Sequence, residues 1–508
     1  MAESLKRQVA KGAVWASLEK FSTQAVTFVV GMVLARLLTP SDYGMVALLG
    51  IFFTIASSLA NCGFGNALVQ RKNAGDLEFN SVFYATLAAS FVVYAGMFFV
   101  APWIARFYET PVLCPLARVS ALSFVLHGIN SVQGAELARK MAFDKRFRVN
   151  LISCAVHATS GIALAFAGLG PWALVVSSLL GTTANVVASW AIIAWRPKWM
   201  FSFSTVRSLF SYGWKLSLSG LINSFYNELY GLLVGKFYTK SDLAFVNKSR
   251  SMPKMLMNAA NQTIAGVSFP ALAKLQDDKA KFRDALRRMI QCSTFLVFPL
   301  LTMLSLTARP LTLLLYGNQW EETVRYVPIG CFALATGPIT YLNCMAISAL
   351  GRSGIYLILE CVKKGTGLVL MILSIRHGVM AFVATMAFVQ SPFTVLANTW
   401  TNGRLIGYSF SMQMRDIFPS IGLCLAMSAS VAVIRIPLIP LLTHIPSQNL
   451  AYTVELLVLG IFGFGTYITL AIHYRMRPLQ EYANILFPVL NKRVPAIARW
   501  INNHIVSA

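Results

Sequence analysis

Long apolar stretches follow one another along almost the whole chain, and short polar turns separate them. A membrane-spanning helix needs about 20 mostly apolar residues, and the pattern predicts about fourteen such spans. The borders fall at turn signals such as Thr39-Pro40-Ser41-Asp42 and Gly168-Leu169-Gly170-Pro171. The expected spans are roughly 12–37, 45–70, 81–103, 115–138, 149–168, 171–195, 212–237, 243–270, 288–308, 327–350, 354–375, 379–402, 416–435 and 451–473.

Composition narrows the class of protein. Of the 508 residues, 56% are hydrophobic and only 12% are charged, while 43 Lys and Arg against 19 Asp and Glu leave a net charge of +24. Such a chain is too apolar for a disordered protein or an ordinary soluble enzyme. A nucleic-acid binder is also basic, but its charge is not diluted by so much apolar sequence. The combination is typical of a polytopic inner-membrane protein.

The basic residues also predict the orientation. If the N-terminus is inside, Lys and Arg on the cytoplasmic side outnumber those outside by roughly three to one. We therefore expect both termini in the cytoplasm, with the chain in the bacterial inner (plasma) membrane. The basic segments 139–148 and 274–288 and the amphipathic tail 474–508 are expected to contact anionic lipids of the cytoplasmic leaflet.

A short repeat connects the two halves. ARLLTPSDYGMVA at 35–47 matches GKFYTKSDLAFVN at 235–247, with Thr, Ser, Asp and Val recurring at an offset of 200 residues. Both copies join two spans at equivalent points, and duplicated halves are an architecture of transporters. The predicted segments are a six-helix lobe at 1–200, a second at 201–402, two additional helices at 403–473 and the tail at 474–508.

Polar side chains inside the spans mark the candidate substrate path, because such groups are costly in lipid and usually face a cavity. They concentrate on the first, second, seventh, eighth and eleventh spans. The basic ones outnumber the acidic ones, so an anionic substrate is expected, with phosphate the natural partner of Lys and Arg. The candidates are Glu19, Lys20, Gln24, Asn61, Asn223, Asn227, Glu228, Asn247, Lys248, Arg250, Lys254, Asn258, Asn261, Lys363 and Lys364.

Structural alternatives exist for several of these residues. Glu360 and Lys364 are four residues apart and can neutralise one another. Lys20 can extend to the cytoplasmic surface, and Lys248 and Arg250 to the outer one, whereas Lys254 lies too deep in its span. The Asn side chains can bond helix to helix.

The sequence contains no motif for catalysis, metal binding or nucleotide binding. The eight Cys form no CxxC pair, the six His show no ligand spacing, and there is no phosphate-binding loop or nucleophile–base grouping. We therefore expect no enzyme activity, no metal, no cofactor and no nucleic-acid partner.

Seven stretches, spread over nearly the whole chain apart from the tail, resemble one family. They are ARLLTPSDYG (35–44), ALVQRK (67–72), ARFYETPVLCPLARVSAL (105–122), GPWALV (170–175), WRPKWMFS (195–202), FPALAKLQDD (269–278) and LLYGNQW (314–320). The chain resembles the polysaccharide-exporter flippases, of the Wzx-like or colanic and teichuronic acid exporter type, in the multidrug/oligosaccharidyl-lipid/polysaccharide (MOP) superfamily.

The resemblance implies an all-α, MATE-like fold of two pseudo-symmetric six-helix lobes plus two C-terminal helices. It implies an oligosaccharide substrate linked to a polyprenyl diphosphate, which basic cavity residues hold while the lobes open to each side in turn. The family's Arg early in the eighth span is replaced by Lys248, with Arg250 two residues on. A coupling ion, H⁺ or Na⁺, and the polysaccharide polymerase or export machinery are left open as further partners.

Two other functions are left open. One is a cation-coupled exporter of small organic cations (a multidrug exporter) on the same fold, against which the lack of Asp inside the spans counts. The other is a membrane protein without transport activity, such as a polymerase or scaffold. The repeated halves and the short loops count against it.

Overall fold

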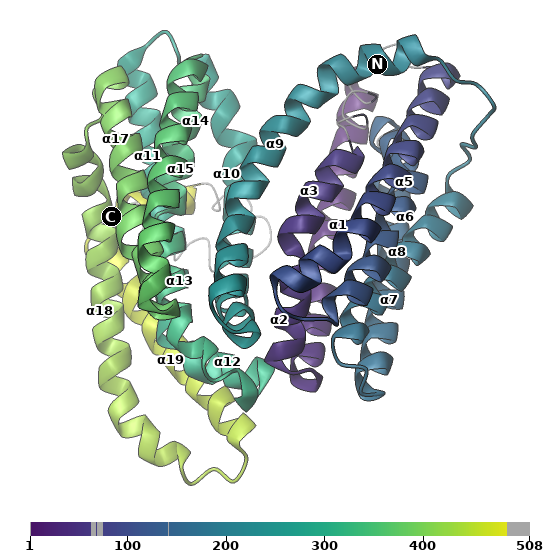
Figure 1. Ribbon diagram of the computed structural model, residues 1–508. Coiled ribbons are helices and arrows are strands. Elements are labelled where there is room, and N and C mark those ends of the chain that lie inside the picture. The colour runs from purple at the N-terminus through teal and green to yellow at the C-terminus, as the bar shows by residue number, and fades with distance from the viewer. Residues whose placement is uncertain (1, 62–63, 65–67, 69–74, 141, 485–508) are drawn as a thin grey trace. The chain divides into compact units, whose positions relative to one another are not determined.

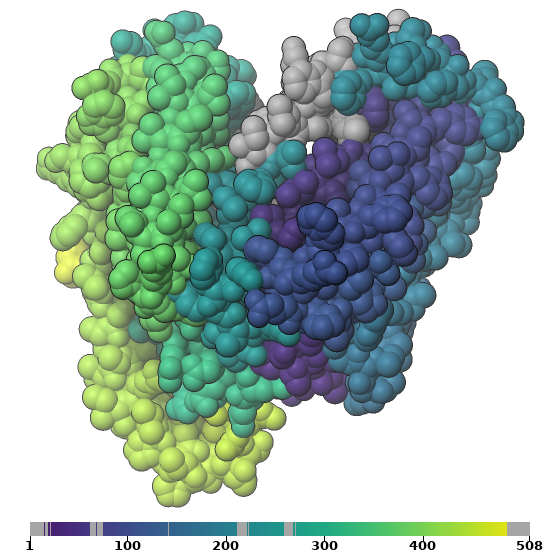
Figure 2. Space-filling model, viewed as in Figure 1, coloured from purple at the N-terminus to yellow at the C-terminus, as the bar shows by residue number. Residues whose placement is uncertain are grey.

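The computed structural model describes residues 2–61, 64, 68, 75–140 and 142–484, and every regular element in this part of the chain is a helix (Figure 1). The contacts divide the chain into two compact units, Met1–Ala244 and Phe245–Ala508. In the face that Figure 2 shows, side chains fill the spaces between the ribbons within each unit. The domain borders expected near 200, 402 and 473 stay a prediction, and the tail from 485 onward lies outside the described residues.

The first unit is a bundle of long helices. Its main contacts join α5 to α6, α7 to α8, α1 to α7 and α3 to α9. The helices are α1 (Ala2–Leu37), α2 (Pro40–Leu48), α3 (Gly50–Asn61), α5 (Asp76–Phe107), α6 (Leu113–Arg139), α7 (Phe143–Phe166), α8 (Pro171–Ile192) and α9 (Phe203–Phe237).

The second unit is built around α11, which contacts α13, α14 and α18, while α18 also packs against α19. The helix that opens it, α10 (Lys240–Lys274), begins within the first unit. The others are α11 (Lys279–Leu306), α12 (Ala308–Tyr316), η1 (Asn318–Trp320), α13 (Thr323–Ala335), α14 (Gly337–Ala349), α15 (Ser353–Ser374), η2 (Ile375–His377), α16 (Val379–Thr385), η3 (Met386–Gln390), α17 (Ser391–Ile406), α18 (Phe410–Leu442) and α19 (Gln448–His473).

The described helices support nine of the fourteen expected spans. Nine of them are long and apolar enough to cross a membrane, and a bent pair, Ser22–Leu37 with Pro40–Leu48 at 119°, is a further candidate. The nine coincide with the third to sixth, ninth, tenth and twelfth to fourteenth expected spans. The other expected spans fall on α1 to α3, α9, α10 and α15, which are the helices for which the sequence predicts polar stripes.

The two copies of the sequence repeat form the same turn. Thr39 caps α2: its backbone N–H and its hydroxyl both donate to Asp42 Oδ2, at 2.9 and 2.7 Å. Thr239 makes the same two bonds to Asp242, at 3.1 and 2.7 Å, at the start of α10. A Thr whose side chain and backbone are bonded to the third residue of a helix fixes the point at which that helix begins.

Candidate functional site

An exposed polar face runs along α10 in the second unit. Asn247, Arg250, Lys254 and Asn258 recur at spacings of three and four residues, and all four are exposed. Residues at this spacing share one side of a helix. The ammonium of Lys254 has no hydrogen bond or ion pair with the described residues. An unpaired ammonium group is costly in lipid, so this face of α10 is expected to border a water-filled path.

Lys248 is only two residues before Arg250, but its side chain packs against aromatic rings. Its ammonium lies 4.1 Å from the ring centroid of Tyr316 and 5.3 Å from that of Trp320. Both rings are buried. A cation above aromatic faces is stabilised by the negative charge of the ring centres, more so where water is excluded. Lys248 thus joins α10 to α12 and η1, and its role in binding substrate stays a prediction.

Lys363 on α15 belongs to a buried polar cluster. Only 5% of its surface is exposed, and its ammonium pairs with the carboxylate of Glu360. It also donates to Asn398 Oδ1 at 3.3 Å and contacts Cys344 Sγ at 3.5 Å. The sequence suggested Lys364 as a neutralising partner of Glu360, but the structure pairs this carboxylate with Lys363, one turn along the helix.

Glu19 on α1 lies at one end of a chain of hydrogen bonds across the first unit. It is 8% exposed, and it accepts from Asn150 Nδ2 at 2.7 Å and pairs with Arg146 Nε at 3.1 Å. Asn185 Nδ2 donates to Asn150 at 3.2 Å, and Asn130 Nδ2 donates to Asn185 at 2.9 Å. We define these five residues as the amide chain, which connects α1, α7, α8 and α6.

The amide chain contains residues that are not among the candidates predicted from the sequence. Asn130, Asn150 and Asn185 are amide side chains within apolar stretches, and this isolation was the available signal. The alternative that Asn side chains bond helix to helix describes them well.

The remaining described candidates of the first unit lie on α1 and α9. Lys20 and Gln24 on α1 are exposed, as are Asn223 and Asn227 on α9. Glu228 is half-buried, and its carboxylate lies against Gly50 of α3. Lys364 in the second unit is half-buried as well. The side chains of Asn61 and Asn261 lie outside the described residues, and the roles of all these candidates stay predictions.

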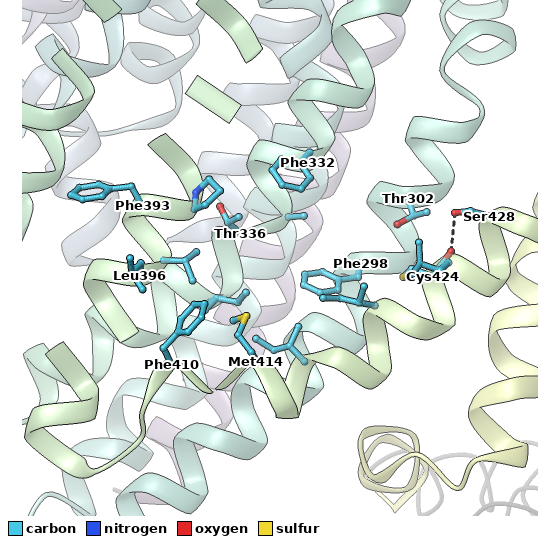
Figure 3. Close-up of a pocket in the computed structure, with 17 residues that line it drawn as sticks. Phe298, Thr302, Phe332, Thr336, Phe393, Leu396, Phe410, Met414, Cys424 and Ser428 are labelled. Atoms are coloured by element: carbon cyan, nitrogen blue, oxygen red, sulfur yellow. Dashed lines mark hydrogen bonds between the residues drawn. The ribbon is translucent and has the colours of Figure 1, made fainter. Parts of the chain in front are cut away.

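An apolar crevice of about 670 Å³ lies within the second unit between α11, α13, α14, α17 and α18 (Figure 3). Phe298, Phe332, Leu396 and Phe410 contribute to its wall. Two of its hydroxyls are satisfied within their own helices: Ser428 donates to the carbonyl of Cys424 at 2.8 Å, and Thr336 to that of Ala333 at 2.8 Å. A wall with so few free polar groups suits a ligand without hydrogen-bonding groups.

Known proteins show to which family this arrangement belongs. The model of the polysaccharide biosynthesis protein family matches residues 33–325, more than half of the chain. The chain belongs to this family. The family resemblance expected from the sequence is thereby confirmed.

Curated relatives of this family member are named for the biosynthesis or transport of polysaccharides. The chain is 26% identical over 337 residues to the succinoglycan biosynthesis transport protein ExoT of Rhizobium meliloti (strain 1021), covering 66% of this chain and 67% of that protein. It is 22% identical over 334 residues to the lipopolysaccharide biosynthesis protein WzxC of Escherichia coli (strain K12), covering 65% and 67%. It is 21% identical over 434 residues to the teichuronic acid biosynthesis protein TuaB of Bacillus subtilis (strain 168), covering 85% and 89%.

Solved structures confirm the fold of this family member. The lipid II flippase MurJ in an inward closed conformation matches with a TM-score of 0.69 and 12% identity, over 91% of this chain and 99% of that one. An inward-facing multidrug resistance MATE family transporter of the MOP superfamily matches with a TM-score of 0.61 and 14% identity, over 76% and 95%. The chain is thus an all-α, multi-pass membrane protein of MATE-like fold and a member of the polysaccharide biosynthesis protein family.

Proposed function

We propose that the protein is a flippase that moves an oligosaccharide linked to a polyprenyl diphosphate from the cytoplasmic to the periplasmic leaflet of the inner membrane. The product would serve surface polysaccharide synthesis, that is, lipopolysaccharide O-antigen, exopolysaccharide or capsule. The mechanism is alternating access, in which the two halves open in turn to each side. The relatives named for succinoglycan, lipopolysaccharide and teichuronic acid biosynthesis support this class of substrate.

The exposed cationic face of α10 is the observation that carries the proposal. Arg250 and Lys254 supply positive charge for the diphosphate, and Asn247 and Asn258 beside them offer amide groups to sugar hydroxyls. A helix with this face does not stay in contact with lipid tails, so a water-filled path beside it is required.

The apolar crevice between α11, α13, α14, α17 and α18 is a candidate site for the polyprenyl tail of the substrate. Its wall along α18 extends from Phe410 to Ser428, about 27 Å at the rise of an α-helix. A wall of this length is comparable to the thickness of the hydrocarbon core, about 30 Å, so it can hold an extended stretch of a polyprenyl tail.

The experiment that tests the proposal is deletion of the gene, followed by mass spectrometry of the lipid-linked glycans in the membrane. We expect a complete polyprenyl-diphosphate-linked oligosaccharide to accumulate on the cytoplasmic leaflet while the surface polysaccharide is lost. The wild-type gene should restore both. Sensitivity to organic cations in a strain with intact surface polysaccharide would contradict the proposal and favour the multidrug exporter.

A further inference from the structure

A polar pocket of about 410 Å³ lies within the first unit, where the two repeated turns meet. We call it the outer pocket, because the distribution of Lys and Arg predicts that this end of the unit faces away from the cytoplasm. Its wall is formed by α2, the residues that follow α5, the end of α9, and the turn and start of α10. The residues used below are Ser41, Tyr108, Glu109, Lys236, Lys240 and Ser241.

The framework of the outer pocket is rigid. Both helix starts at its rim are held by Thr–Asp caps. The backbone of Gly44 lies directly against the carbonyl of Lys240, and Gly235 lies against the side chain of Leu48. Fixed walls favour binding because little conformational entropy is lost when a ligand enters.

The polar groups of the outer pocket are only partly used within the protein. Lys236 Nζ donates to the carbonyl of Phe107 at 2.6 Å and lies 3.4 Å from Glu109 Oε1. The Lys240 ammonium and the hydroxyls of Ser41 and Ser241 have no hydrogen-bond partner among the described side chains. Two ammonium groups and one carboxylate leave the pocket positively charged.

Tyr108 adds a buried donor to this wall. Its side chain is 8% exposed, and its hydroxyl has no hydrogen-bond partner among the described residues. Burial raises the pKa of this phenol to about 12, so it keeps its proton at neutral pH. A buried hydroxyl without a partner is costly, and a ligand that accepts a hydrogen bond removes this cost.

We propose that the outer pocket binds an acidic sugar unit, a pyranose ring that carries a carboxylate. The carboxylate pairs with Lys240, the ring hydroxyls bond to Ser41 and Ser241, and the ring lies against Tyr108. An inorganic anion would fill only a small part of the volume, which is in the range of small-molecule sites. A hydrocarbon chain would leave the polar wall unsatisfied. The inference rests on the proposed function and deepens it, because it names a class of sugar in the transported oligosaccharide that the protein would hold on the periplasmic side before release.

The test uses the full-length protein in nanodiscs, with methyl β-glucuronide and methyl β-glucoside as probes in a saturation-transfer NMR titration. We expect the glucuronide to bind about tenfold more tightly than the glucoside. Lys240→Gln should remove this preference while leaving binding of the glucoside unchanged. Lys145→Gln, at an exposed lysine of α7 outside the pocket, is the matched control and should behave as wild type.

Three outcomes would overturn the inference: no saturable binding of the glucuronide, an unchanged preference in Lys240→Gln, or full displacement of the sugar by inorganic phosphate at equal concentration. The probes carry no lipid, so this titration is independent of flipping. Loss of sugar binding with a confirmed flippase refutes the outer pocket alone, whereas sugar binding without glycan accumulation in the deletion strain refutes the flippase alone.

Discussion

Gly44 of α2 lies so close to the backbone carbonyl of Lys240 that a β-carbon on Gly44 would overlap the carbonyl oxygen. The two residues belong to the two copies of the repeated turn, whose equivalent positions are 200 residues apart in the sequence. The overlapping atoms would be backbone atoms at the start of a capped helix, so they cannot move aside as the end of a flexible side chain can.

Gly44→Ala should therefore destabilise the first unit. We expect a cost of about 1–3 kcal/mol, the usual range for overpacking, measured as a lower melting temperature of the purified protein. Gly31→Ala is the matched control, because a β-carbon on Gly31 meets nothing within 4 Å. Equal melting temperatures for the two variants would show that the turns are not in contact in solution.

Lys254→Glu should abolish export while the protein still reaches the membrane. The substitution reverses the charge on the exposed face of α10, so a diphosphate would be repelled there. Lys254→Arg should keep most of the activity because it keeps the charge. The measurement is surface polysaccharide relative to membrane-inserted protein, with Lys145→Glu, on exposed α7, as the control. Normal polysaccharide in Lys254→Glu would falsify the role of this lysine.

Two substitutions of Glu19 distinguish a structural role of its side chain from a role in binding a coupling ion. Glu19→Leu removes the acceptor of Asn150 and the partner of Arg146, and an unpaired buried amide costs about 1–3 kcal/mol. Glu19→Gln keeps an acceptor for Asn150, so we expect it to melt close to wild type and to transport. If Glu19→Gln is stable but inactive, the carboxylate carries a coupling ion rather than a helix contact.

A bidentate ion pair between Arg287 and Asp416 links α11 to α18 in the second unit. Arg287 donates from Nε to Asp416 Oδ2 at 2.7 Å and from Nη2 to Oδ1 at 2.5 Å, and the Tyr408 hydroxyl donates to Oδ2 at 2.8 Å. Asp416→Ala should destabilise the protein by about 1–3 kcal/mol, since it removes the acceptor of the buried Tyr408 hydroxyl and the partner of the half-exposed Arg287. Asp284→Ala, at an exposed carboxylate of the same region, should change the melting temperature little.

A bulky side chain in the apolar crevice should displace a lipid tail. Ser428→Phe fills part of the crevice, whereas Ala429→Phe places the same ring on the neighbouring, exposed position. Native mass spectrometry with added polyprenyl phosphate should show less bound lipid for Ser428→Phe, by about fivefold or more, as expected for roughly 1 kcal/mol of lost apolar contact. Equal binding by the two variants would rule out the crevice as the site of the tail.

Much of the architecture could be predicted from the sequence because lipid leaves few options. Backbone groups in the hydrocarbon core must be bonded within the same segment, so an apolar stretch of sufficient length becomes a helix. The repeat at Thr39 and Thr239 is visible for a related reason, since a Thr–Asp cap depends on residues only three positions apart. Local interactions of this kind can be read from consecutive residues.

Polar partners inside the bundle were much harder to predict. The sequence placed Glu19, Lys248 and Lys363 on the correct helices, but it showed neither the amide chain, nor the rings beneath Lys248, nor the preference of Glu360 for Lys363. Lys363 and Lys364 both lie within one turn of Glu360, and the choice depends on Asn398 from α17.

By itself, the sequence determined that this protein is a multi-pass, all-α membrane protein of the polysaccharide biosynthesis protein family, with polar stripes on a few of its helices. Hydropathy, turn residues and short motifs act over a few residues, so they can be read along the chain. Only the tertiary structure decided which polar groups bond to other helices and which, such as the ammonium groups of Lys254 and Lys240, have no hydrogen-bond partner among the described residues. That distinction depends on side chains from helices far apart in sequence, which packing brings within hydrogen-bonding distance.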